Sequence, residues 1–233
     1  TVRSISKLNQ GFVLLVGPTG CGKSTTLASL INDINQNQAK HIITIEDPIE
    51  FVHESKKSLV NQREIGAMTH SFSNALKSAL REDPDMILVG EMRDLETIRL
   101  ALTAAETGHL VLGTLHSSSA AKTINRIIDV FPESEKDMVR TMLSESIEAI
   151  ISQSLLKTKD GNGRVAAHEI MVGTSAIRNL IRENKVAQMY SAIQTGANYG
   201  MTTLDQSLKN LVTKGVISPQ TARTAAKQPE TFL

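Results

Sequence analysis

The sequence is poor in several residue types, and each shortage excludes a class of function. A single cysteine, Cys21, cannot form an intramolecular disulfide, and it excludes a zinc site built from several cysteines. With five Phe, two Tyr and no Trp, the chain has few side chains on which nucleic-acid bases or sugars could stack. Lys and Arg outnumber Asp and Glu by only 25 to 24, so the charge excess typical of proteins that bind nucleic-acid phosphates is lacking. We therefore expect no nucleic-acid partner.

Long apolar stretches are lacking as well. No uninterrupted run approaches the ~20 residues that a membrane-spanning helix needs, so we expect no direct insertion into a membrane. The chain starts at Thr1 without a signal-peptide pattern, which favours an intracellular location and a fragment cut from something longer. Its 233 residues still suffice for a buried core in one large domain or two small ones.

Short apolar runs that end in polar or glycine-rich residues dominate the first half of the chain. They predict buried strands at residues 12–16, 42–45, 86–89 and 110–115. Helical patterns at residues 24–34, 73–80 and 95–107 separate these runs. Strands that alternate with helices predict an α/β fold with a mostly parallel sheet, and such sheets bind ligands at the carboxyl ends of their strands.

The pattern changes after residue 116. Residues 120–130 and 133 to about 156 are typical of helices, the second long enough for a break, and residues 164–172 predict a strand. Helices are expected at 174–183, 186–194, 203–214 and 219–227, the last with Ser218 as N-cap and Pro219 at its first position. We therefore expect a core domain over residues 1–155 and a small, mainly helical subdomain over residues 156–233.

The strongest motif follows the first expected strand and precedes a helix, as a P-loop (Walker A) should. It matches G-x-x-x-x-G-K-S/T and, with the next residue, gives the expected nucleotide-binding set Gly17, Pro18, Thr19, Gly20, Cys21, Gly22, Lys23, Ser24 and Thr25. Its glycines let backbone N–H groups turn toward phosphates. Lys23 is expected to reach the β- and γ-phosphates, and the Ser24 hydroxyl to coordinate a metal. The expected cofactors are ATP and Mg²⁺.

Nucleotide hydrolysis also needs a carboxylate to orient water or hold the metal. The third expected strand ends in Gly90-Glu91, with glycine where many P-loop ATPases place a metal-holding aspartate, so Glu91 is the candidate for polarising the attacking water. Glu46, Asp47 and Glu50 follow the second expected strand. They are candidates for further carboxylate ligands, and a solvated acidic turn is the alternative.

Two histidines bracket the fourth expected strand. His116 follows its carboxyl end, where an imidazole could sense or donate to a γ-phosphate. His109 precedes the strand, about 20–24 Å away if the chain is extended. It cannot share one γ-phosphate with His116 unless the chain bends or His109 serves a neighbouring subunit.

Longer motifs make the chain resemble a known family. Residues 80–94 fit the signature of secretion ATPases, L-R-x-x-P-D followed by four residues and G-E-x-R-D. Residues 44–50 are similar to the acidic "Asp box" of that family, and residues 107–116 to its "His box". Ala176–Glu183 is similar to the C-terminal motif of its pilus-retracting branch. From about residue 10 to its end, the chain resembles the type IV pilus retraction ATPases.

The resemblance implies a RecA-like core and an ATPase that works as a subunit of a homo-hexameric motor. Such a motor retracts type IV pili for twitching motility, acting on an inner-membrane pilus platform protein from the cytoplasmic face of the bacterial inner membrane. It implies Glu91 as catalytic glutamate, Glu46 and Glu50 as acidic-box residues, and His109 and His116 as His-box residues. The implied retraction motif is Ala176, Ile177, Arg178, Asn179, Leu180, Ile181, Arg182 and Glu183. An N-terminal PAS-like domain of this family is absent from the sequence.

Other functions stay open on the residues alone. Within the family, the alternatives are a paralogous accessory retraction ATPase or a type II secretion ATPase, although the latter commonly carries a four-cysteine zinc module that a one-cysteine chain cannot form. A small-molecule kinase would need an arginine-rich lid that the helical tail does not show. A nucleic-acid translocase is the remotest alternative. Ala176–Glu183 also reads, on spacing alone, as an ordinary surface helix packed on its subdomain.

Overall fold

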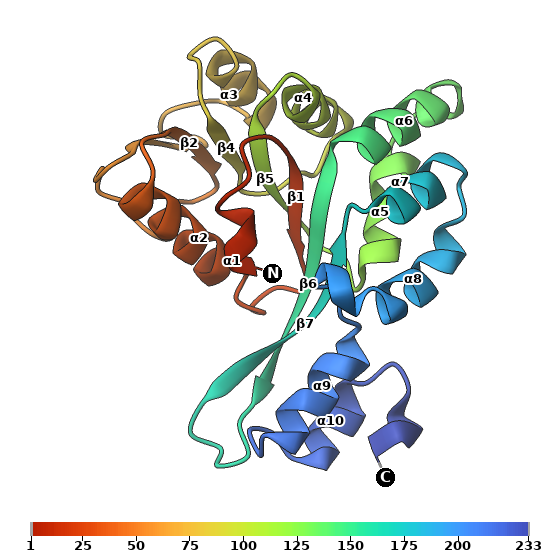
Figure 1. Cartoon of the computed structure of the whole chain (residues 1–233). Coiled ribbons are helices and arrows are strands. Elements are labelled where there is room, and N and C mark those ends of the chain that lie inside the picture. The colour runs from red at the N-terminus through yellow and green to blue at the C-terminus, as the bar shows by residue number, and fades with distance from the viewer. Residues whose placement is uncertain (1, 233) are drawn as a thin grey trace.

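The computed structural model describes residues 2–232, and a seven-stranded sheet forms its centre (Figure 1). The strands are β1 (Gly11–Val16), β2 (His41–Glu46), β3 (Leu59–Glu64), β4 (Met86–Val89), β5 (Leu110–Leu115), β6 (Ile147–Lys157) and β7 (Arg164–Val172). Their order across the sheet is β3-β2-β4-β5-β1-β6-β7, and the neighbouring pairs are parallel except β6 with β7. The predicted α/β fold with a mostly parallel sheet is confirmed.

Helices cover both faces of the sheet. They are α1 (Val2–Ile5), α2 (Lys23–Asn37), α3 (Phe72–Ala79), α4 (Leu95–Glu106), α5 (Ala120–Asp129), α6 (Lys136–Ser146), α7 (Ser175–Arg182), α8 (Met189–Thr195), α9 (Leu204–Thr213) and α10 (Pro219–Ala225). Short 3-10 turns occur at Glu133–Glu135, Val186–Gln188, Ala197–Tyr199 and Pro229–Phe232. Helix α10 begins as predicted, with the Ser218 side chain accepting a hydrogen bond from the Thr221 backbone N–H and Pro219 in the first turn.

The core explains why the central strands are continuous apolar runs. All residues of β1, β4 and β5 are buried, as strands covered on both faces require. One hydrophobic cluster packs helices α3 to α8 against one face of the sheet, and a second packs α1 and α2 against the other. The carboxyl ends of β1, β2, β4 and β5 are thereby held rigidly side by side.

One expected helix is wrong. Residues 133–156 form a 3-10 turn, then α6, which ends at Ser146, and then the strand β6. The apolar residues Ile147, Ile150 and Ile151 have a spacing that a helix and a buried strand share, so periodicity alone did not separate them. Residues 147–157 form a strand because they pair with β1 on one side and with β7 on the other. The edge strand β3 was also missed, because its sequence, LVNQRE, is mostly polar.

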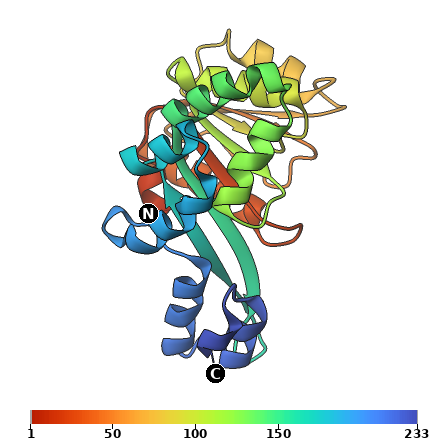
Figure 2. The same cartoon turned by 90° about the vertical axis from the view of Figure 1, so that its right-hand side faces the viewer.

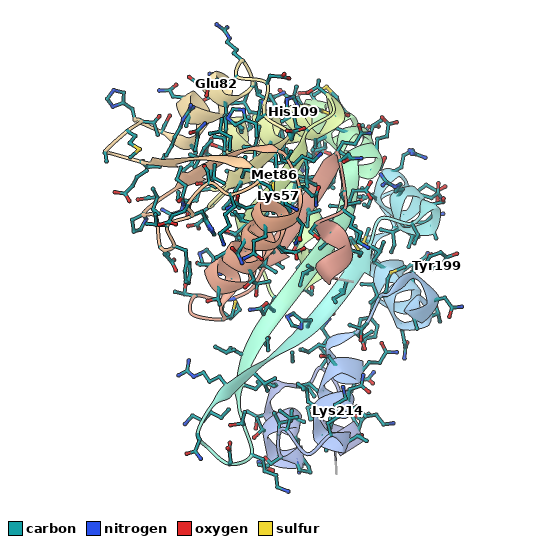
Figure 3. The ribbon with its side chains drawn as sticks, turned by 60° about the vertical axis from the view of Figure 1, so that its left-hand side comes forward. Lys57, Glu82, Met86, His109, Tyr199 and Lys214 are labelled. Carbon is teal, nitrogen blue, oxygen red and sulfur yellow. The ribbon has the colours of Figure 1, made fainter. Side chains whose placement is uncertain are left out.

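Strands β6 and β7 form a long hairpin that extends beyond the sheet, and α9 and α10 pack on its far end (Figures 1 and 2). Ala167 of β7, Leu208, Ile217 and Ala222 form a small separate hydrophobic cluster there. Figure 3 shows Lys214 on this distal part, away from Met86 in the sheet.

The expected boundary between residues 155 and 156 lies inside β6. Helices α7 and α8, which follow that boundary, pack on the main core through Ile177, Ile181 and Met189. The division into domains 1–155 and 156–233 stays a prediction, and its end residues Thr1 and Leu233 lie outside the described part of the chain. Across residues 2–232, every helix falls short of the length and apolar character that crossing a bilayer requires.

Candidate functional site: a phosphate-binding cavity

A cavity of about 590 Å³ opens at the carboxyl ends of β1, β2, β4 and β5. The residues predicted from sequence that line it are Thr19, Gly20, Gly22, Lys23, Ser24, Thr25, Glu46, Asp47, Glu50, Glu91 and His116. Because parallel strands end at one edge of the sheet, motifs far apart in the sequence meet there. The structure thus brings together most of the predicted site.

The P-loop connects β1 to the first turn of α2. Gly17, Gly20 and Gly22 have φ values of 151°, 75° and 89°, which side chains rarely tolerate. A Cβ atom on Gly17 would lie 2.5 Å from the carbonyl oxygen of Gln153 and 2.6 Å from Sγ of Cys21, so this position admits only glycine. Gly17 and Cys21 are buried, and with Pro18 they build the loop without being among the described cavity-lining residues.

Lys23, the first residue of α2, points back over the loop. Its Nζ donates hydrogen bonds to the carbonyl oxygens of Gly17, at 2.9 Å, and Pro18, at 3.1 Å. These contacts hold the ammonium group beside the helix N-terminus, where the backbone N–H groups of the first turn face the cavity. Ser24 and Thr25 line the cavity in the same turn. The arrangement can bind an anion of several negative charges, as a polyphosphate is.

Glu91 follows β4 and contacts two cationic or protonatable side chains. Its Oε1 lies 3.1 Å from Nε2 of His116, and its Oε2 accepts a hydrogen bond of 2.5 Å from Arg93. The hydrogen bond from Arg93 lowers the pKa of the Glu91 carboxyl below its usual value, and the charges of Arg93, His116 and Lys23 act in the same direction against the effect of partial burial. Glu91 is therefore ionised near pH 7, as a group that takes a proton from water must be.

Steric crowding explains why a glycine, Gly90, precedes Glu91. A Cβ atom on Gly90 would lie 3.0 Å from the carbonyl oxygen of Ile45 and 3.2 Å from Cα of Glu46, because β2 and β4 converge there. The Thr114 hydroxyl donates a hydrogen bond to the Gly90 carbonyl oxygen from the neighbouring strand β5. An aspartate at this position would not fit without a shift of β2.

The acidic turn after β2 faces the same cavity. Oε1 of Glu46 accepts hydrogen bonds from the Thr44 hydroxyl, at 2.6 Å, and from Nε2 of Gln62, at 3.1 Å. Oε2 of Glu64 accepts a hydrogen bond of 2.9 Å from the Ile49 backbone N–H, which holds the turn against β3. The peptide bond between Asp47 and Pro48 is cis. Glu46 is thereby oriented by its neighbours, whereas the exposed Asp47 and Glu50 are not.

His109 is the one predicted catalytic residue that the structure leaves apart from the others. It lies just before β5, at the opposite end of that strand from His116, and it is not among the described residues that line the cavity. Its Nδ1 lies 3.1 Å from the Ala104 carbonyl oxygen, a contact that closes the end of α4. Within this chain, His109 and His116 therefore do not act on one phosphate.

The predicted retraction motif forms α7, outside the cavity. Ile177 and Ile181 are fully buried against the main core, and Leu180 packs on it. Arg178 donates hydrogen bonds to the carbonyl oxygens of Gly173, Ser144 and Glu145 and pairs with Glu148 at 2.7 Å. The guanidinium of Arg178 thereby joins the end of α6 to the start of β6. Arg182 is exposed and only approaches Ser144 Oγ at 3.4 Å.

Sequence reasoning missed several side chains of the cavity. Arg93 holds Glu91, and Phe51, His53 and Phe72 give the cavity an aromatic side. Burial lowers the pKa of His53, so this imidazole is neutral near pH 7. The low aromatic content of the whole chain concealed that two of its five phenylalanines lie here. The arginine of the G-E-x-R-D signature is the sequence signal that marks Arg93.

Comparisons with known proteins agree with this geometry. A family model described as "Type II/IV secretion system protein" matches residues 1–223. The chain is 69% identical over 230 residues to the "Type IV pilus retractation ATPase PilT" of Pseudomonas aeruginosa, covering 99% of this chain and 67% of that protein. It is 66% identical to a "Twitching motility protein" of Neisseria gonorrhoeae, covering 99% and 62%. A crystal structure of the pilus retraction motor PilT with bound ADP superposes with a TM-score of 0.91 at 53% identity, covering 99% and 65%.

The within-family alternatives are more distant. The type IV pilus ATPase PilU of Pseudomonas aeruginosa is 42% identical over 221 residues, covering 95% of this chain and 58% of that protein. The type II secretion system protein E of Xanthomonas campestris is 42% identical over only 158 residues, or 68% of this chain and 26% of that protein. The chain spans about two thirds of the length of the relatives from Pseudomonas aeruginosa and Neisseria gonorrhoeae named above. The resemblance to the pilus retraction branch is confirmed.

Proposed function

The chain belongs to the type II/IV secretion system protein family, and from that premise we propose that it hydrolyses ATP to drive the retraction of type IV pili. The observation that carries the proposal is that residues of the P-loop and the ionised Glu91 line the same cavity. The similarity to a retraction ATPase over 99% of the chain supports pilus retraction, rather than pilus extension, as the process that hydrolysis drives. Hydrolysis converts ATP and water to ADP and phosphate.

In this proposal each residue has one task. The P-loop amides and Lys23 bind the phosphates and offset their charge. The carboxylate of Glu91 accepts a hydrogen bond from a water molecule and orients its oxygen toward the γ-phosphorus. The water oxygen bonds to the γ-phosphorus as the P–O bond to the β-phosphate breaks and ADP leaves, and a proton of that water passes to Glu91 or to an oxygen of the phosphate that forms. Arg93 keeps Glu91 ionised, and His116 fixes the direction of its Oε1.

The donor set also fits Mg²⁺. The Ser24 hydroxyl lies at the start of α2, and the carboxylate of Glu46 faces the same cavity. Mg²⁺ prefers oxygen ligands and is commonly held by one or two protein groups together with phosphates and water. Residues 2–232 contain no cluster of three or more His, Cys, Asp or Glu side chains able to hold a metal, which agrees with such a shared site. The ion would supply charge neutralisation at the phosphate oxygens.

The remaining parts of the proposal concern the assembly. We infer that the protein works as a homo-hexamer at the cytoplasmic face of the bacterial inner membrane, against the pilus platform protein. His109, at the opposite end of β5 from the cavity, would then serve a neighbouring subunit. Residues 176–183 would contribute to retraction through the exposed side of α7, where Asn179, Arg182 and Glu183 lie.

The deciding experiment compares Glu91→Gln with wild type in the full-length protein. We expect nucleotide binding within about threefold of wild type and a loss of phosphate release of at least ~100-fold, because the amide cannot accept a proton from water. Glu96→Gln, at an exposed position on α4, is the matched control and should keep full turnover. Unchanged hydrolysis by Glu91→Gln would remove this residue from the mechanism.

A second experiment tests whether the protein drives pilus retraction. Full-length protein should restore pilus retraction in a strain that lacks its retraction ATPase, and Lys23→Ala should not. Rescue only of a strain that lacks the accessory paralogue would overturn the assignment to the main retraction motor. Strong, salt-sensitive stimulation of turnover by DNA would favour a translocase instead.

A further inference from the structure

The P-loop rests on a side chain that none of the nucleotide motifs contains. Gln153 of β6 is 2% exposed, and its Nε2 donates a hydrogen bond of 2.7 Å to the Cys21 carbonyl oxygen. Its Oε1 accepts a hydrogen bond of 2.9 Å from the Thr26 hydroxyl in the first turns of α2. One buried amide thus contacts the loop on one side and the helix that follows it on the other.

The orientation of this amide is fixed by its partners. A backbone carbonyl only accepts hydrogen bonds, so the NH₂ group of Gln153 must face Cys21 and its oxygen must face Thr26. The same oxygen lies 3.1 Å from Nε2 of His168 on β7. That imidazole must therefore carry its proton on Nε2 in order to donate. Burial lowers the pKa of His168, which keeps the ring neutral with one N–H to give.

His168 is held in place from outside the site. Gln153 and His168 are direct cross-strand partners in the β6–β7 pair. The backbone N–H of His168 also donates a hydrogen bond of 3.1 Å to the Ser207 hydroxyl of α9. The hydrogen bonds thus run without a gap from the P-loop through Gln153 and His168 to the distal helices.

The contact with Cys21 has a consequence for phosphate binding. In a planar trans peptide the C=O of one residue and the N–H of the next point in opposite directions. Drawing the Cys21 carbonyl toward Gln153 therefore aims the N–H of Gly22 away from β6, and Gly22 lines the cavity. The backbone of the P-loop also packs directly against the backbone of β6, since a Cβ atom on Gly17 would lie 2.5 Å from the Gln153 carbonyl oxygen.

We propose that Gln153 is a positioning residue for nucleotide binding, which holds the Cys21–Gly22 peptide with its N–H toward the phosphates, and that His168 locks the Gln153 amide in that orientation. The inference deepens the proposed function, because the ligand is the diphosphate of the same nucleotide. It predicts a role in affinity for ADP and ATP and not in the chemical step.

The test uses full-length protein with Gln153→Ala, Gln153→Met and Ser154→Ala. Ser154 is the matched control because successive side chains of a strand point to opposite faces. Binding of a fluorescent ADP analogue, KM and kcat for ATP, and the melting temperature are measured. We expect Gln153→Ala to raise the Kd for ADP and the KM at least ~5-fold through the unpartnered Cys21 carbonyl, with kcat within about threefold. Ser154→Ala should match wild type in all three measurements.

Gln153→Met keeps about the length and volume of the side chain but supplies no N–H to the Cys21 carbonyl oxygen. It should fold and lose about as much ADP affinity as Gln153→Ala, which keeps the test decisive if the alanine variant is unstable. His168→Ala should weaken ADP binding less, and adding it to Gln153→Ala should cause no further loss, because both act through one amide. Wild-type ADP affinity in folded Gln153→Met or Gln153→Ala overturns the proposal. ADP affinity decides this role even if the protein fails to hydrolyse ATP, a failure that would overturn the proposed function alone.

Discussion

The Nε2 atom of His116 lies 3.1 Å from Oε1 of Glu91, and the two residues come from the ends of neighbouring strands β5 and β4. Arg93 holds the other oxygen of the same carboxylate. Both oxygens of Glu91 are therefore engaged, and the hydrogen bond from Arg93 is the main cause of the lowered pKa of this carboxyl. The first prediction follows from this arrangement.

Removing the Arg93 guanidinium should shift the acid limb of the pH–rate profile. The pKa of Glu91 is lowered in the folded protein, so its carboxylate persists above that value and is lost only as the pH falls through it. Arg93→Ala should raise this pKa and move the loss of kcat to higher pH, whereas Arg93→Lys, which keeps a cation, should shift it less. Steady-state turnover between pH 4 and pH 8 checks this, and identical acid limbs in wild type and Arg93→Ala would contradict it.

Gly90→Ala should be costly although alanine is only one carbon larger. Its Cβ would press on the backbone of Ile45 and Glu46, and overpacking of a rigid region costs about 1–3 kcal/mol. Because Glu91 follows directly, turnover should fall together with stability. Gly163→Ala is the control, since its nearest neighbour, Thr158, would lie at an ordinary 3.5 Å. Urea unfolding and phosphate release measure both effects, and equal stabilities of the two variants would exclude the steric explanation.

The two arginines of α7 should behave differently. Arg178→Ala removes hydrogen bonds to three carbonyl oxygens and an ion pair with Glu148, so it should lower the free energy of unfolding by about 2–3 kcal/mol. Arg182→Ala, at an exposed position, should leave stability and ATP turnover near wild type.

If the motif serves retraction, Arg182→Ala in the full-length protein reduces pilus retraction at unchanged turnover. A double variant of both arginines would mix a folding defect with a motor defect. Turnover of Arg182→Ala as low as that of Lys23→Ala would contradict the assignment of α7 to retraction.

The ion pair between Glu169 and Lys227 should stabilise the attachment of the C-terminal segment. Glu169 is 2% exposed, accepts a hydrogen bond of 2.8 Å from the Ala120 backbone N–H, and pairs with Lys227 at 2.5 Å. Lys227→Ala leaves a buried carboxylate without its cation, and we expect a loss of about 1–3 kcal/mol, because Lys227 is itself partly exposed. Lys214→Ala is the control. Thermal unfolding decides, and a melting temperature equal to that of the control would show that the pair contributes nothing.

The parts of the site that could be predicted from the sequence are those whose signal lies within a short stretch of the chain. The P-loop carries its own backbone geometry, and Glu91 and His116 each follow a recognisable strand, so the rule that ligands bind at the carboxyl edge of a parallel sheet placed them together. The fold class followed from the same strands. No comparable local signal marks Gln153 or Glu169.

Those residues could not be found because their roles depend on pairing between distant segments. The stretch around Gln153 fits a helix as well as a strand on spacing, and only its position between β1 and β7 brings the amide to the P-loop. The contacts of Arg178 could not be predicted for the same reason, because helical spacing shows which residues share a face but not that the end of α6 lies beside that face. Tertiary contacts therefore decided what periodicity left open.

The rate at which the one thiol of the chain reacts with a reagent in solution reports on the opening of the P-loop. Cys21 is 3% exposed, and its Sγ lies in the space that a side chain on Gly17 would occupy. An alkylating reagent can reach this sulfur only when the loop opens, so the rate of labelling counts opening events without any engineered cysteine. Bound nucleotide should slow the labelling of Cys21, and loosening of the loop should accelerate it, so mass spectrometry of the peptide that contains Cys21 would report the average state of the loop.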